Sequence, residues 1–170
     1  MTYITLVSNV DDPIHNATNR PGHFSTRLDY PLTWEKHSEI AVYQLLYPKA
    51  YQVQSMDVKG DPRLFLATNL FPIGGRASQV TGDPDSPLHK LDLPVCLAFV
   101  PEKPVKNQEP GVYQAVTASY LPYFPLQDQE LNSLRDIEVR LVDSQGETVE
   151  FEALGGSDNL LVTFHIRSTE

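Results

Sequence analysis

Short apolar runs, separated by prolines and glycines, follow one another along the whole chain. Residues 24–30, FSTRLDY, alternate between one face with Phe, Thr, Leu and Tyr and another with Ser, Arg and Asp. This period of two is typical of a half-buried strand, and Pro31 predicts that it continues only as an edge or a bend. Residues 39–47, EIAVYQLLY, are apolar on both faces apart from Gln44 and the leading glutamate, which predicts a central strand covered on both sides.

The same reasoning predicts about ten strands and almost no helix. The 14 prolines leave no gap between Pro13 and Pro125 that is long enough for a substantial helix. Only the short segment Pro125–Leu134 has a helical pattern. The expected strands are 3–7, 24–30, 39–47, 51–58, 63–70, 91–100, 112–120, 137–141, 148–151 and 160–166.

The closing stretch, residues 137–168, has the most regular pattern. Ile137, Val139 and Leu141 alternate with polar residues, and DSQG follows, in which Gly146 is free to take the positive φ of a tight hairpin. A return strand, a second Gly-rich turn at 155–158 and a final alternating strand complete it. Ten strands are enough for two packed antiparallel sheets, and we find no internal repeat, so we expect one all-β domain over residues 1–170.

The composition narrows the classes of function. The chain has 170 residues, 13 basic and 22 acidic, and a net charge of −9. We therefore expect no direct contact with nucleic acid, which requires clustered Lys and Arg. The amino-terminal sequence has no signal-peptide pattern, and no apolar run approaches the roughly 20 residues of a membrane span, so we expect a soluble protein made in a reducing compartment.

Candidate chemistry is sparse, and each feature also has a structural explanation. The single cysteine, Cys96, excludes an intrachain disulfide and is expected to be a buried apolar residue rather than a nucleophile. His165 is expected on the outer face of its sheet rather than in a catalytic role. There is no GxSxG elbow and no Walker lysine after Gly74–Gly75.

Two acidic loops contain possible metal ligands. His15 and His23 share a loop with Asp11 and Asp12, which is compatible with a metal site, although a solvated loop is the preferred interpretation. The stretches DDP at 11–13 and DPD at 83–85 have the ligand chemistry of Ca²⁺ but not the spacing of a calcium loop, so turn formation is preferred. We expect no metal, no cofactor and no enzyme activity.

Aromatic residues offer the remaining candidates. Tyr120, Tyr123 and Phe124 cluster in SYLPYFP, and Tyr43, Tyr47 and Tyr51 lie close together in the sequence. Aromatic side chains on loops stack on sugars or fill a partner's pocket, and others belong to the core. The residues that we expect at an interface are Phe71, Tyr120, Tyr123 and Phe124.

Two stretches resemble a known family. Residues 24–48, FSTRLDYPLTWEKHSEIAVYQLLYP, resemble a pattern near the start of small jelly-roll capsid proteins, in which an alternating F-x-x-x-L strand leads into P-L, a polar turn and an apolar strand ending in Y-P. The closing stretch DIEVRLVDSQGETVEF…LLVTFHIR is similar to theirs in its D-x-x-G hairpin and its T-x-H-I-R end. These proteins are the pentons and minor capsid proteins of virophages, polinton-like (Maverick) elements and related double-stranded DNA viruses of eukaryotes.

The resemblance covers about a third of the chain and implies a single jelly-roll β-sandwich. It implies a structural capsid protein of the virion, assembled inside the host cell, which forms a homo-oligomer, preferably a pentamer at the icosahedral vertices, next to major capsid proteins. Two alternatives remain open at this point. One is a minor or cement capsid protein of the same fold, and the other is a β-sandwich module that binds carbohydrate or protein through the aromatic residues at 120–124.

Overall fold

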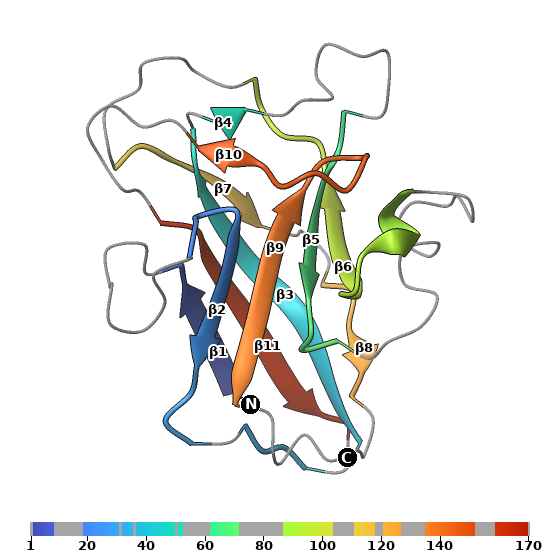
Figure 1. The fold of residues 1–170 in the computed structure, drawn as a ribbon. Coiled ribbons are helices and arrows are strands. Elements are labelled where there is room, and N and C mark those ends of the chain that lie inside the picture. The colour runs from blue at the N-terminus through green and yellow to red at the C-terminus, as the bar shows by residue number, and fades with distance from the viewer. Residues whose placement is uncertain are drawn as a thin grey trace.

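The chain folds into two antiparallel β-sheets packed face to face (Figure 1). The computed structural model describes residues 2–8, 19–30, 32–35, 37–49, 51–52, 62–71, 87–103, 111–117, 121–126, 135–151 and 159–169. Within these ranges the elements are β1 (Thr2–Val7), β2 (His23–Arg27), β3 (Ser38–Pro48), β4 (Tyr51–Gln52), β5 (Leu64–Thr68), the 3-10 turn η2 (Pro87–Lys90), β6 (Val95–Phe99), β7 (Tyr113–Thr117), β8 (Phe124–Pro125), β9 (Asp136–Val142), β10 (Glu150–Phe151) and β11 (Leu161–Ser168).

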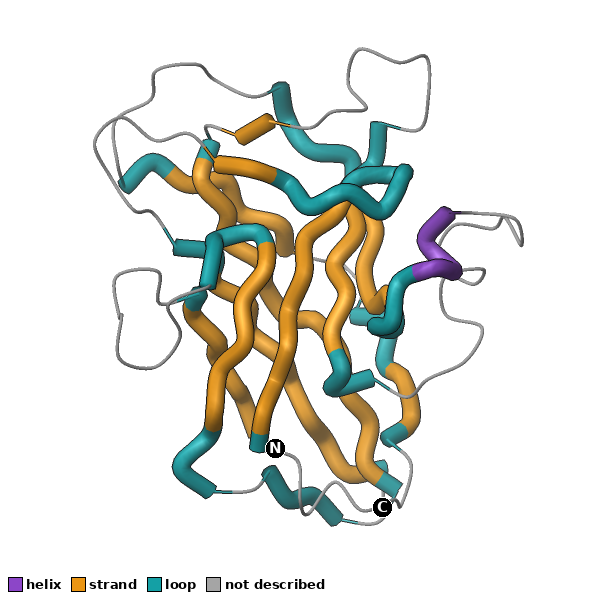
Figure 2. The backbone as a smooth tube through the Cα atoms, viewed as in Figure 1, coloured by secondary structure: helices purple, strands orange, loops and turns teal. Residues whose placement is uncertain are grey.

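The first sheet, here called sheet A, has the order β1-β11-β3-β7, with β8 also paired to β3, and sheet B has the order β2-β9-β5-β6. The pairings are nested: β1 pairs with β11, β2 with β9, β3 with β7 and β5 with β6. The chain therefore resembles one long hairpin rolled around a core. Figure 2 shows that strands dominate the described residues and that the short helical turn lies outside the sandwich. The predicted all-β sandwich of two antiparallel sheets is confirmed.

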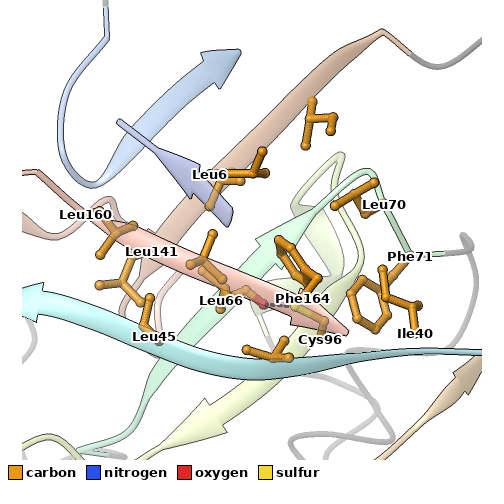
Figure 3. Packing of buried hydrophobic residues seen from close by; sticks show 14 of the residues in the cluster. Leu6, Ile40, Leu45, Leu66, Leu70, Phe71, Cys96, Leu141, Leu160 and Phe164 are labelled. Atoms are coloured by element: carbon orange, nitrogen blue, oxygen red, sulfur yellow. Dashed lines mark hydrogen bonds between the residues drawn. The ribbon is translucent and has the colours of Figure 1, made fainter. Parts of the chain in front are cut away.

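The core lies between the two sheets because each strand directs alternate side chains inward. Phe164 and Leu45 from sheet A meet Leu66 and Leu141 from sheet B, all fully buried (Figure 3). Cys96 is 2% exposed, and its thiol donates a hydrogen bond to the carbonyl O of Leu66 at 3.3 Å. Burial raises the pKa of this thiol far above its usual range, so the expectation of a buried apolar cysteine is confirmed.

Strand β5 is buried on both faces. Leu64 and Leu66 face the central core, whereas Phe65 and Ala67 belong to a second cluster on the outer side of sheet B. Leu88 of η2 covers that cluster together with Leu93. The outer face of sheet B is therefore closed over β5 and β6 by the segment around η2.

The return strand after the DSQG turn differs from its predicted place. Gly146 has a φ of +81°, as the turn requires, and the buried Asp143 accepts hydrogen bonds from the backbone N–H groups of Gln145 and Glu147. Beyond the isolated bridge between Val142 and Thr148, however, the chain does not pair along β9. Because β2 and β5 already occupy both sides of β9, β10 instead crosses the end of the sandwich and pairs with β4.

The structure confirms some of the other predicted elements and corrects others. β2 (His23–Arg27) forms most of the predicted strand at 24–30, and β3 is a central strand of sheet A, as expected. The expectation that β3 is covered on both sides is wrong at Tyr43, which is 44% exposed. The predicted helix is wrong at its first residue, since Pro125 belongs to β8, and residues 127–134 lie outside the described residues. The predicted strand at 51–58 is described only at its first two residues, which form β4, and the loop at 72–87 lies almost wholly outside the description.

We predict that Gly22→Ala destabilises the fold by about 2 kcal/mol or more. A Cβ at Gly22 would clash with the carbonyl O of Val149, which belongs to the backbone and has no flexible end that could move away. Urea unfolding of both forms measures the difference.

Gly111→Ala is the matched control. Gly111 has open space around it but a φ of +87°, so alanine there should cost only about 1 kcal/mol. Equal losses in the two variants would contradict the close approach at Gly22.

Candidate functional site

Five side chains gather on the outer face of sheet A, and we call them the outer aromatic cluster: Tyr3, Tyr43, Tyr123, His165 and Arg167. Alternation along the strands brings three of them together. Tyr3 of β1 lies directly opposite His165 of β11, and Arg167 lies two residues further on the same face. Phe164 and Ile166, which flank His165 in the sequence, point into the core.

Tyr43 reaches this face through a β-bulge. In the β3·β11 ladder Gln44 is opposite Thr163 and Val42 is opposite Phe164, so Tyr43 is an extra residue on β3. Its ring meets the ring of Tyr3 edge to face, with centroids 5.2 Å apart. Tyr3 and Tyr43 are 54% and 44% exposed, so the two rings form an aromatic surface that faces solvent.

His165 lies beneath this surface. The ring of Tyr3 stacks on it at 4.6 Å with an interplanar angle of 24°, and His165 is only 5% exposed. Its Nδ1 shares a short hydrogen bond with the hydroxyl of Tyr123. The predicted outer-face position of His165 is correct, but the imidazole is covered rather than solvated.

Arg167 closes the cluster at the end of β11. Its guanidinium lies 3.6 Å from the centre of the Tyr123 ring, a cation–π contact, and donates to Oε2 of Glu39 from Nε at 3.1 Å and Nη2 at 3.0 Å. Tyr123 is therefore held from both sides, by His165 and by Arg167.

The electrostatics of the cluster disfavour the protonated form of His165. Burial lowers the pKa of the imidazole, and the nearby positive charge of Arg167 lowers it further. Its Nε2 atom is buried without a hydrogen-bond partner among the described residues. A proton gained there would place a second positive charge next to Arg167 with no acceptor to stabilise it.

This arrangement is suited to contact rather than to chemistry. The polar atoms are already bonded within the chain, since the Tyr123 hydroxyl pairs with His165 and the Arg167 guanidinium pairs with Glu39. The exposed parts are the rings of Tyr3 and Tyr43. Exposed tyrosine rings present apolar area together with a hydroxyl, which suits a protein or a sugar surface.

The residues expected at an interface are placed differently from one another. Phe71 is 2% exposed and packs in the core against Phe124 and Phe164, so its side chain offers no surface to a partner. Phe124 packs partly buried against that core, and Tyr123, the residue before it, points outward. Tyr120 lies outside the described residues.

Sequence reasoning missed the main members of the cluster, Tyr3, His165 and Arg167. The signal was present, because residues 3, 165 and 167 all fall on the polar side of an alternating strand. What the sequence could not reveal is that β1 and β11 are neighbours.

The other predicted candidates do not form a metal site among the described residues, where no group of three His, Cys, Asp or Glu side chains comes together. His23 instead pairs with Glu138 at 2.7 Å. His15, Asp11, Asp12 and the stretch 83–85 lie outside the described residues.

His23 also lines an open pocket of about 250 Å³ at the end of β2. The pocket residues are Asn19, Arg20, His23, Phe24, Ser25 and Thr148. Its charged groups are already paired within the chain, His23 with Glu138 and Arg20 with Glu150, so the pocket is a weaker candidate than the outer aromatic cluster. No helix within the described ranges is long and apolar enough to cross a membrane.

No protein-family model matches the chain, and a search of curated proteins also finds no match.

We predict that the stability of the protein falls as the pH is lowered below about 6.5, in part because of His165. In the folded state the pKa of the imidazole lies below its ordinary value, whereas the unfolded chain takes up a proton at the ordinary value. The unfolded state therefore binds more protons as the pH falls. His165→Gln should therefore lose less stability on acidification than the unsubstituted protein does. Urea unfolding above and below a pH of about 6.5 measures the loss of stability of the unsubstituted protein and of the variant.

His23→Gln is the control for the loss of a histidine that lies outside the cluster, and it should keep the His165-dependent part of the fall. If the unfolding free energies of the His165→Gln variant and the unsubstituted protein fall equally with pH, the cluster does not lower the pKa of His165.

Proposed function

We propose that this chain is a structural capsid protein with a single jelly-roll fold, and that it forms pentamers at the vertices of an icosahedral virion. In this proposal it has no catalytic role and needs no cofactor. Its partners are further copies of itself and the neighbouring major capsid proteins. A minor or cement capsid protein of the same fold is the nearest variant.

One observation carries the proposal. The two stretches that resemble jelly-roll capsid proteins are separated by almost ninety residues, and yet their strands pair with each other. β2 from the first stretch pairs with β9 from the second in sheet B, and β3 pairs with β11 in sheet A. The parts of the chain that carry the resemblance therefore form one unit that spans both sheets.

The nested strand order supports the jelly-roll part of the proposal. A jelly roll is a double sheet of eight strands, and eight longer strands of this chain form two four-stranded sheets. The first and last strands, β1 and β11, pair with each other in sheet A, and β11 also pairs with β3.

The charge and the shape fit a shell protein that does not condense the genome. A net charge of −9 disfavours direct contact with nucleic acid. A sandwich has a broad flank on each side, which suits the heterologous contacts that close a ring. We place one such contact at the outer aromatic cluster.

A second candidate function rests on that same cluster. The exposed rings of Tyr3 and Tyr43, 5.2 Å apart and nearly perpendicular, are the type of surface on which a sugar ring stacks. In this alternative the chain is a β-sandwich module that binds carbohydrate. A glycan array distinguishes the two, since reproducible binding that is lost in Tyr3→Ala supports the module and its absence supports the shell protein.

Native mass spectrometry over a concentration series tests the pentamer. We predict a species of about five times the 19.1 kDa chain mass, because heterologous contacts around a fivefold axis close without leaving a free surface. Tyr43→Asp, which replaces an exposed ring of the cluster by a negative charge, should weaken this species.

Tyr30→Asp is the matched control, because it makes the same chemical change at a side chain that is 83% exposed and outside the cluster. A trimer would assign the protein to another position in the shell. A monomer at every concentration would contradict self-assembly into a pentamer.

A further inference from the structure

Strand β1 is an edge strand of sheet A: it pairs with β11, and no other described strand pairs with its outer side (Figure 1). Hydrogen-bonded and non-bonded pairs alternate along an antiparallel ladder. The N–H of Ser8 donates to the O of Leu160, so the bonded positions on β1 are Leu6, Ile4 and Thr2.

The backbone N–H and C=O groups of Tyr3, Thr5 and Val7 therefore point away from β11. Two side-chain contacts agree with this assignment of the outward residues, because side chains lie closer together in residue pairs that are not hydrogen-bonded to each other. Tyr3 stacks on His165, and the hydroxyls of Thr5 and Thr163 are 3.0 Å apart. Among the residues that the structure describes, none forms a hydrogen bond with the backbone of these three residues on the side away from β11.

The corresponding edge of sheet B is protected. On β2 the outward backbone groups belong to His23, Ser25 and Arg27, because Leu28 is bonded to Arg135. The side chain of Asn19 bonds both the N–H and the C=O of Ser25, and Arg20 exchanges two backbone hydrogen bonds with His23. The third position, Arg27, carries a charge. Both the bonded backbone groups and this charge hinder pairing of β2 with another strand.

β1 has none of these protecting features. Its sequence, TYITLV, contains no charge and no proline, and its register with β11 runs without a bulge. Thr2, Tyr3 and Thr5 are exposed. Such an edge is a template for another strand.

We propose that two copies of this chain associate by pairing their β1 strands antiparallel about a twofold axis at Thr5. In this register Thr5 lies opposite Thr5 of the second copy, and Tyr3 lies opposite Val7 in both directions. All three outward residues of each copy are then paired, with about six hydrogen bonds across the seam. On the inner face Ile4 meets Leu6, so the apolar alternation continues from one copy to the other.

The strand itself favours a second copy of the chain as the partner. Each copy has a net charge of −9, so copies repel one another over most of their surfaces, but TYITLV brings no charge to the seam. The segment is also complementary to itself, with matching apolar residues on one face and Tyr, Thr and Val on the other. This pairing is isologous and joins only two copies, so it is distinct from the heterologous ring contact proposed above and does not depend on it.

Cysteine cross-linking tests the register. Residues of a bonded pair have Cα atoms about 5.5 Å apart, within the range of a disulfide, so Thr5→Cys should form a covalent dimer under mild oxidation. Val7→Cys is the matched control, because Val7 lies four residues from Val7 of the second copy, roughly 13 Å along the strand. Cys96 is buried and should not cross-link in either variant.

Two further variants test the backbone pairing. Thr5→Pro removes an N–H that points to the free edge while leaving the bonds to β11 intact, and proline is tolerated at such a position. It should weaken the dimer by about tenfold or more, as measured by analytical ultracentrifugation. Thr5→Lys should do the same by placing two like charges opposite each other.

Amide hydrogen exchange provides a measurement without substitution. On dimerisation the amides of Tyr3, Thr5 and Val7 should become slower to exchange, whereas Ile4 and Leu6, already bonded to β11, should change little. The proposal is overturned if Thr5→Cys cross-links no better than Val7→Cys, or if Thr5→Pro and Thr5→Lys leave the dimer fraction unchanged. Loss of the dimer with the fivefold species retained would leave the proposed ring intact, and the reverse result would leave the β1 pairing intact.

Discussion

The antiparallel pairing of β3 with β11 is the contact on which the rest of the molecule depends. It joins the first third of the chain to its end over eight residue pairs, and β11 then holds β1 while β3 holds β7 and β8. One irregularity within this ladder has two effects. Because Tyr43 is an extra residue on β3, both Leu45 and Val42 face the core, and Tyr43 itself faces solvent beside Tyr3. The same bulge thus maintains the core and builds the outer aromatic cluster.

The two sheets manage their outer surfaces in opposite ways. Sheet B is covered over β5 and β6 by the segment around η2, and its edge strand β2 is closed by Asn19 and Arg20. Sheet A exposes tyrosine rings on its face and an uncharged backbone edge at β1. An edge or aromatic surface left open costs a protein solubility unless something binds it, so the contacts that this chain makes are expected to concentrate on sheet A.

Most of the strands could be predicted from the sequence, because alternation and proline stops are local signals. The class of fold followed from their number. The predictions that failed were those that depend on which distant part of the chain lies next to a residue. The return strand after Gly146 was expected to run beside β9, but β9 already has neighbours on both sides. Phe71 was expected at an interface because it follows a strand and precedes a loop, but Phe124 and Phe164 enclose it.

The sequence by itself determined most of the strands, the apolar face of the alternating ones, where Gly146 must turn, and that Cys96 would be buried. These properties depend on residues close together in the chain, so periodicity and turn chemistry are sufficient to predict them. Only the tertiary structure decided that Tyr3 stacks on His165, that Arg167 lies over Tyr123, and that the β2 edge is closed while that of β1 is open. Each of these depends on which strands and loops become neighbours in the folded chain or on a bulge within a ladder. Neither the order of the strands nor their register is encoded in a local pattern.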